Sequence, residues 1–120
     1  MDTSKEYIKM CDCPEIQEGW RSPLKGDFYF KKSRNYVCVY HEDEPFSWDD
    51  NIFLPRQDQL QEMIINDYEL EFIKNAEYEY TLKFYFPATI YMKWDKPEKL
   101  FLQMYMLIEH DKTWNEDEWV

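Results

Sequence analysis

Three cysteines and two histidines are the residues of this chain best suited to metal binding or nucleophilic chemistry. All five have donor atoms that zinc prefers, and the four that invite a zinc site are Cys11, Cys13, Cys38 and His41. Cys11 and Cys13 would lie about 200° apart on a helix, and Cys38 and His41 would face opposite ways on a strand. The chain also lacks a Cys-x-x-Cys pair. We therefore expect no metal site, no cofactor, and free or buried thiols.

Carboxylates are the other groups that could support catalysis, as acid–base pairs or as Mg²⁺ ligands. Asp58 and Glu62 lie four residues apart and share one face of an expected helix. Such pairs are also typical of a solvated face, and a Mg²⁺ site needs further ligands. His41 and His110 each stand beside acids but belong to no catalytic motif. We therefore predict that the chain is not an enzyme, with a carboxylate- or metal-dependent enzyme as the last alternative.

The charge of the chain bears on the partners that it can bind. It has 25 acidic and 14 basic residues, a formal net charge of −11, and the excess acid is spread over both halves. Phosphate contacts require clustered Lys and Arg, so we expect no direct binding to nucleic acid. The chain has two glycines, which argues against a glycine-rich phosphate loop. A charge of this sign keeps a small protein soluble or presents a surface to a basic partner.

Length and hydropathy indicate one globular domain outside the membrane. The chain has 120 residues, of which 44% are hydrophobic, and this is enough to enclose one core. We expect a single domain over residues 1–120. No stretch reaches the roughly 18 apolar residues of a membrane span. Residues 1–6 lack the basic head and apolar run of a secretory signal, which predicts a cytoplasmic protein.

The amino-terminal half is expected to hold helices and a β-hairpin. A helix that begins at Ser4 would place its apolar residues on one face. Pro14 interrupts this helix before a second, short one that stops near Gly19. β-forming residues at 27–30 and 36–40 flank a polar run, which predicts a hairpin with a basic tip.

The central part of the chain changes its periodicity. Pro55 suits the first position of a helix. Apolar residues recur every fourth position from Leu60 onwards and support a helix to about residue 76. The pattern then alternates with period two, which predicts strands at 78–86 and 89–94. If the helix continued instead, the domain would be mostly α.

The carboxyl-terminal part predicts one buried helix. Asp95 as N-cap and Glu98 three residues later form a capping-box pattern. Residues 100–108 are almost entirely apolar, so their helix should be central and buried on most sides. Trp114 and Trp119 indicate a chain end that is docked rather than loose. The predicted fold class is α+β: an N-terminal helix, a β-hairpin, a central helix, further strands and a buried C-terminal helix.

One string in the chain is specific enough to suggest a family. Residues 54–63, LPRQDQLQEM, resemble a motif that recurs in small uncharacterised proteins encoded by phages and prophages of bacteria. Shorter segments near both ends are similar as well: residues 6–11, 15–17, 26–28, 98–102 and 112–120. The resemblance implies a phage context for nearly the whole chain. It implies no activity and supplies no catalytic residues.

These patterns favour an accessory protein that acts by binding an unknown host or phage protein, because aromatic anchors often dominate interfaces. The candidate contact residues are Arg56, Gln57, Trp114 and Trp119. The alternative is an acidic DNA mimic that occupies the basic groove of a nucleic-acid-binding protein. It predicts rows of carboxylates at phosphate-like spacing, drawn from the acidic clusters at 42–44, 49–50 and 115–118.

Overall fold

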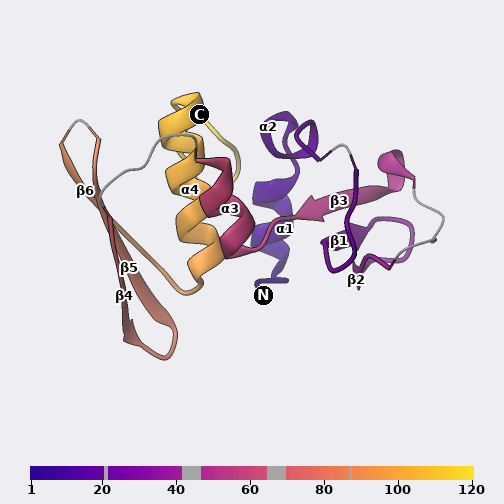
Figure 1. Cartoon of the computed structure of the whole chain (residues 1–120), viewed down its shortest axis with the longest axis horizontal. Helices are drawn as coiled ribbons and strands as arrows, with labels where there is room; N and C mark the ends of the chain where they lie inside the picture. Colours follow the sequence, from indigo (N-terminus) through magenta and orange to yellow (C-terminus); the bar gives the residue numbers. More distant parts are fainter. Residues whose placement is uncertain (21, 42–46, 65–69, 87) are drawn as a thin grey trace. The chain divides into compact units, whose positions relative to one another are not determined.

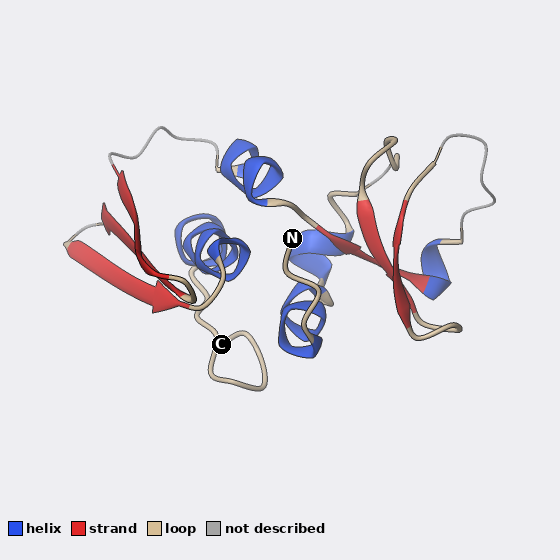
Figure 2. Cartoon of the chain, turned by 90° about the horizontal axis from the view of Figure 1, so that it is seen from below, coloured by secondary structure: helices blue, strands red, loops and turns tan. Residues whose placement is uncertain are grey.

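The computed structural model describes residues 1–20, 22–41, 47–64, 70–86 and 88–120. Within them the chain forms four α-helices and two three-stranded antiparallel sheets, so the predicted α+β class is confirmed (Figures 1 and 2). Contacts between residues gather into two compact units. The first unit is Thr3–Arg56 with Met1, and the second unit is Gln57–Val120 with Asp2. A single domain over residues 1–120 stays a prediction.

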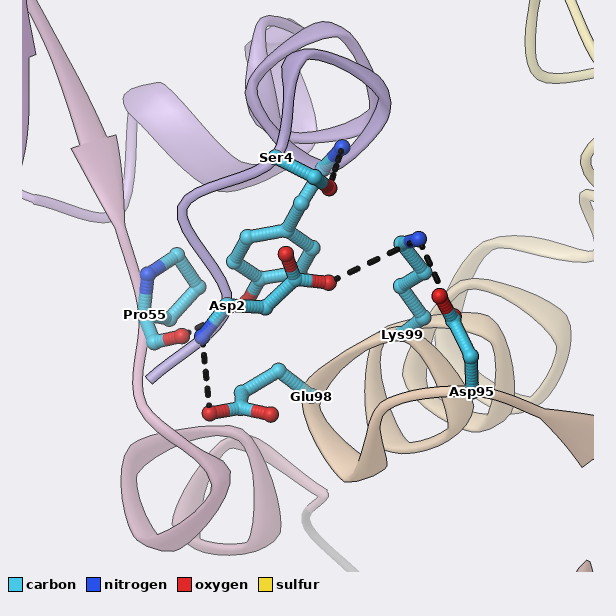
Figure 3. Close-up of polar contacts among 7 residues, drawn as sticks. Asp2, Ser4, Pro55, Asp95, Glu98 and Lys99 are labelled. Atoms are coloured by element: carbon cyan, nitrogen blue, oxygen red, sulfur yellow. Dashed lines mark hydrogen bonds and ion pairs between the residues drawn. The ribbon is translucent and has the colours of Figure 1, made fainter. Parts of the chain in front are cut away.

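Two short helices open the first unit, as the sequence predicts. α1 (Lys5–Cys11) begins after Ser4, whose Oγ accepts a 3.2 Å hydrogen bond from the backbone N–H of Tyr7 (Figure 3). Pro14 opens α2 (Pro14–Gln17), because a proline suits the first helical position but cannot continue a helix. α2 ends two residues before Gly19, close to the predicted stop.

The first unit also contains a sheet of order β2-β1-β3. β1 (Phe28–Lys31) and β2 (Tyr36–Val39) form the predicted hairpin, whose turn places Asn35 at a φ of 54°. β3 (Asn51–Leu54) follows the 3-10 turn η1 (Trp48–Asp50) and pairs with the other side of β1. β3 is absent from the sequence-based expectation because its four residues are all buried and show no alternation.

The core of the first unit lies between its helices and β3. α1 and α2 both pack on β3, and the indole of Trp20 stacks on the ring of Phe53 with centroids 4.7 Å apart. Tyr29, the cross-strand partner of Phe53, lies 6.3 Å from the same indole. The hydroxyl of Tyr7 donates a 2.6 Å hydrogen bond to the carbonyl of Pro55 (Figure 3). This bond fastens α1 to the residue that follows β3.

α3 (Gln57–Met63) opens the second unit and is shorter than the predicted central helix. It starts two residues after Pro55, so the proline does not occupy the first helical position. The prediction of a helix to about residue 76 is wrong, because residues 70–76 form a strand. Residues 65–69 lie outside the described part of the chain. A spacing of four is even, so it places side chains on one face of a strand as well as on one face of a helix.

The second unit contains a sheet of order β4-β5-β6, and α4 lies along one of its faces (Figures 1 and 2). Its strands are β4 (Leu70–Ala76), β5 (Glu79–Tyr85) and β6 (Thr89–Trp94). The two strands predicted at 78–86 and 89–94 are therefore confirmed. β4 is the strand that replaces the far end of the predicted helix.

α4 (Pro97–His110) is the buried C-terminal helix that the sequence predicts. All of its residues from Glu98 to Leu102 are buried. Leu82 of β5 is buried on the side of the sheet that packs against α4. The rings of Phe72 in β4 and Phe101 in α4 lie 5.4 Å apart. The core of the second unit is therefore the layer between this helix and one face of the sheet.

The start of α4 differs from the predicted capping box. The N-cap is Lys96 and not Asp95, and no side-chain hydrogen bond caps the helix among the described residues. Asp95 accepts a 3.1 Å hydrogen bond from the Nζ of Lys99, which also lies 3.7 Å from the carboxylate of Asp2 (Figure 3). Glu98 accepts the backbone N–H of Asp2 at 3.1 Å. Both predicted capping residues therefore contact other groups.

The chain ends in a small hairpin that pairs the two tryptophans. Thr113 and Val120 exchange two backbone hydrogen bonds of 2.8 and 2.9 Å. Between them Trp114 faces Trp119, with ring centroids 5.1 Å apart. The side chain of Asn115 closes the turn, because its Oδ1 accepts two backbone N–H groups. Contacts within this segment therefore order the chain end.

Candidate functional site

Arg56, one of the predicted contact residues, holds the loop before β1. Its Nη1 donates a 3.0 Å hydrogen bond to the carbonyl of Gly26 and lies 3.7 Å from Oδ1 of Asp27. Asp27 is buried, and its Oδ2 accepts the indole N–H of Trp20 at 3.0 Å and the backbone N–H of Leu24 at 2.9 Å. The side chain of Arg56 is 35% exposed. Its observed contacts are structural, and binding of a partner by Arg56 stays a prediction.

The other three predicted contact residues belong to the second unit. Gln57 is the first residue of α3 and is half-buried. Trp114 and Trp119 are half-buried and contact each other in the C-terminal hairpin. The Nε1 of Trp114 is buried and has no hydrogen-bond partner among the described residues. The structure thus pairs the two tryptophans, and a role of these residues in binding stays a prediction.

A cleft on the first unit gathers acidic side chains that are far apart in the sequence. Its volume is about 340 Å³. The polar residues that line it are Asp12, Gln17, Glu18, Lys32, Asp49 and Asn51. They come from the ends of α1 and α2, the tip of the β1–β2 hairpin, and the segment of η1 and β3. We call this feature the acidic cleft.

Two of the carboxylates in the acidic cleft stand at helix ends. Asp12 is the C-cap of α1, and its backbone N–H bonds to the carbonyl of Ile8. Glu18 is the C-cap of α2. The dipole of a helix repels a negative charge at its carboxyl end, so neither acid stabilises the helix that it follows. The third acid, Asp49, lies in η1 directly before β3.

The three carboxylates of the acidic cleft have no hydrogen-bond or ion-pair partner among the described residues. Asp50, next in the chain to Asp49, has a carboxylate that is hydrogen-bonded. Its carboxylate accepts bonds from the Oγ and the backbone N–H of Ser33 at 2.6 and 2.8 Å, and these bonds hold the pKa of Asp50 below its usual value. Of the described residues that line the cleft, Lys32 is the one cation. The lining therefore carries a net charge of about −2 at neutral pH.

Asn51 adds a buried polar atom to the wall of the acidic cleft. The residue is 8% exposed, and its Nδ2 donates a 2.6 Å hydrogen bond to the carbonyl of Ser47. Its Oδ1 has no hydrogen-bond partner among the described residues. A buried acceptor left unpaired costs about 1–3 kcal/mol. A donor group that enters the cleft and reaches this oxygen would remove that cost.

This arrangement of acceptors suits a positively charged organic group. Carboxylate and amide oxygens accept hydrogen bonds, whereas the lysine ammonium and the arginine guanidinium are pure donors. Hydrogen bonds between ionised partners of this kind are stronger than neutral ones. The cleft volume of about 340 Å³ lies at the small end of the range for ligand sites, about 300–1,000 Å³. It can therefore take a single extended side chain.

The cysteines considered as zinc ligands are free thiols. Cys11 is buried in α1. Burial raises the pKa of Cys13 to about 11, so this thiol is neutral near pH 7 and is a poor nucleophile and metal ligand there. In the described part of the chain, no three His, Cys, Asp or Glu side chains form a group that could hold a metal ion.

The three acidic clusters considered for a DNA mimic lie in different settings. Residues 42–44 fall outside the described part of the chain. The pair at 49–50 is divided, because Asp49 lines the acidic cleft whereas Asp50 binds Ser33. The acids of residues 115–118 are exposed on the turn of the C-terminal hairpin. Rows of carboxylates at phosphate-like spacing stay a prediction.

Comparison with known proteins gives no relative for this chain. No protein-family model, no curated protein and no solved structure matches it. In the described residues, no helix has both the length and the apolar character that crossing a membrane requires. The chemistry of the chain's own residues is therefore the guide to its function.

Sequence reasoning did not identify the acidic cleft. Its acids come together because α1, α2 and η1 all meet at β3, a strand that the pattern does not reveal. One signal was present, since Asp12 and Glu18 each follow a helix end where a negative charge is unfavourable. No feature of the sequence distinguishes the buried amide of Asn51 from that of an ordinary turn residue.

Proposed function

We propose that the chain is a phage-type accessory protein without catalytic activity whose acidic cleft binds a basic segment of a host or phage protein. The observation that carries the proposal is a group of three carboxylates around one cleft that have no partner within the described ranges of the chain. The resemblance of residues 54–63 to a phage-encoded motif supports the phage context. The genes beside its gene test that context, since phage genes there support it and host housekeeping genes contradict it.

Magnitudes favour a segment with several basic residues over a single charge. An exposed ion pair contributes about 0.2–1 kcal/mol, so one side chain in the cleft binds weakly. The net charge of −11 attracts further basic residues over a distance of about 8 Å at physiological salt. A segment that places one lysine or arginine in the cleft and further basic residues outside it should therefore bind more tightly than a single basic side chain.

Isothermal titration calorimetry with a short Arg- and Lys-rich peptide tests the proposal. We expect binding with a Kd of about 10–100 μM that weakens as salt is raised, and no binding of a peptide with glutamine at the basic positions. The cleft variant carries Asp12→Asn, Glu18→Gln and Asp49→Asn. It should bind about tenfold more weakly, a loss of about 1.4 kcal/mol.

A matched control separates the cleft from the overall charge. Glu116→Gln, Asp117→Asn and Glu118→Gln remove three acids from the C-terminal turn and give the same net charge as the cleft variant. The control should lose less than about threefold in affinity. Equal losses in both variants would contradict the cleft and favour the DNA mimic, whose acids act together. Absence of binding to the peptide by the unchanged protein would refute the proposal outright.

A further inference from the structure

The sheet β4-β5-β6 has one face on α4 and an outer face that no described element of the second unit covers (Figures 1 and 2). The register of the strands aligns Ile73, Thr81 and Lys93 in one row across this face. The adjacent row is Glu71, Lys83 and Tyr91. We call these two rows, with Glu79 and Tyr85 at the two ends of β5, the outer face.

Large apolar side chains are exposed on the outer face. Ile73 is 49% exposed, and Tyr85 and Tyr91 are each 65% exposed. The Nζ of Lys83 lies 5.6 Å from the ring centroid of Tyr91. Tyrosine is enriched in interfaces because its ring buries area while its hydroxyl keeps a hydrogen bond. An apolar patch rimmed by charges is typical of a surface that contacts another protein.

The charges on the outer face are balanced although the chain as a whole is strongly acidic. Lys83 and Lys93 stand against Glu71 and Glu79, whereas the formal net charge of the chain is −11. Lys93 and Glu79 are 3.9 Å apart, and both are largely exposed. A two-fold interface brings a surface onto its own copy, so it needs both signs in similar number. The outer face meets this condition, because lysines of one copy can face glutamates of the other.

A buried hydroxyl lies at the middle of the outer face. Thr81 is 8% exposed, and its Oγ1 has no hydrogen-bond partner among the described residues. It stands on the central strand, between Ile73 and Lys93.

We propose that the outer face binds the outer face of a second copy of this chain and forms a two-fold symmetric dimer. The two sheets would stack about 10 Å apart, as in a β-sandwich. Three strands about 4.8 Å apart and about 20 Å long give a footprint of about 300 Å² per copy, small for a specific interface. The dimer is therefore weak and reversible, with a Kd of about tens of micromolar.

Sedimentation equilibrium of the full chain tests this interface over about two decades of concentration around the expected Kd. We expect a reversible monomer–dimer equilibrium. Tyr91→Glu should weaken the dimer at least about tenfold, because it removes an exposed ring from the contact and brings an unpaired charge into it. Tyr36→Glu is the matched control, since Tyr36 is a 52% exposed tyrosine of β2 in the first unit. It should leave the Kd within about twofold.

Charge reversal distinguishes a true self-contact from a damaged fold. Lys83→Glu and Glu71→Lys should each weaken their own homodimer, because like charges then face each other across the two-fold axis. An equimolar mixture of the two variants should regain dimers, since each supplies the charge that the other lacks. A chain that stays monomeric at the highest concentration would overturn the proposal. A mixture with no more dimer than either variant alone, or a Tyr36→Glu effect equal to that of Tyr91→Glu, would also overturn it.

Discussion

The two three-stranded sheets of this chain are stabilised by different contacts, side-chain hydrogen bonds to the backbone in one and packing on a helix in the other. In the sheet β2-β1-β3, the amide of Gln17 donates to the carbonyl of Phe53 at 3.0 Å and accepts its N–H at 2.8 Å. Asp50 binds the backbone of Ser33 in the turn of the same sheet. In β4-β5-β6, no side chain bonds to the backbone of a strand among the described residues. One face of that sheet is buried against α4 instead.

The difference follows from strand length. Strands of four residues have few ladder bonds and little alternation, so polar groups from distant segments complete the sheet and close its edge at β3. Strands of six or seven residues alternate between two faces, so β5 buries Leu82 and Phe84 towards α4 whereas Lys83 and Tyr91 lie on the other face of the sheet. The first unit therefore offers a polar cleft between connecting segments, and the second offers a flat sheet surface.

The largest effect should come from the buried face of the longer sheet. Leu82 is fully buried, so Leu82→Ala should lower the free energy of unfolding by about 2–5 kcal/mol through lost contacts and a cavity. Urea unfolding followed by circular dichroism measures the change. Thr81→Val on the opposite face is the control and should shift the free energy by less than about 1 kcal/mol, because the hydroxyl has no hydrogen-bond partner in the part of the chain that the structure describes. If both variants lowered the free energy of unfolding by a similar amount, the claim that the sheet packs mainly through the face on α4 would be wrong.

A smaller effect is expected for the hydrogen bonds through which the side chain of Gln17 connects α2 to β3. Gln17→Ala removes the bonds to Phe53 and a 2.8 Å bond to the carbonyl of Cys11. The free energy of unfolding should fall by about 1–3 kcal/mol, since part-buried backbone groups lose their partners. Gln61→Ala on the exposed face of α3 should change it by less than about 0.5 kcal/mol. If Gln17→Ala lowered the free energy of unfolding no more than this control, the hydrogen bonds of Gln17 would not stabilise β3.

The smallest effect concerns the turn of the β1–β2 hairpin. Hydrogen bonds from Ser33 lower the pKa of Asp50, so the ionised carboxylate stabilises the turn above the unfolded pKa of 3.8. This stabilisation is lost as the pH falls through the lower, folded pKa. Ser33→Ala should raise the pKa of Asp50 towards 3.8, as measured by NMR titration of its side chain. Ser47→Ala is the control, and a pKa of Asp50 that stays unchanged in Ser33→Ala would contradict this role.

Local signals predicted much of the fold. The cap at Ser4, the break at Pro14, the first hairpin and the last two strands all depend on residues close together in sequence. The prediction of the central helix failed because its residue pattern fits two kinds of secondary structure. The four-residue spacing from Leu60 to about residue 76 fits a helix and a strand equally, and pairing with β5 selects the strand at β4.

The candidate sites were less accessible to sequence reasoning. Arg56 was predicted as a contact residue for a partner, and in the structure its guanidinium contacts Gly26 and Asp27 of the same unit. The acidic cleft depends on the meeting of segments distant in sequence, which no local pattern encodes. Trp114 and Trp119 were predicted to dock the chain end, and the structure places their rings against each other across a β-bridge. This contact between two cross-strand neighbours was not part of the prediction.

The most direct measurement of the central claim is an NMR titration of the isotopically labelled chain with the Arg- and Lys-rich peptide. If the acidic cleft is the binding site, backbone signals of Asp12, Glu18, Asp49 and Asn51 should shift most and follow a single binding curve. Signals of β4, β5 and β6 should stay in place. Shifts that are spread over acidic residues of both units, or that centre on the C-terminal turn, would contradict the cleft as the site where this protein binds its partner.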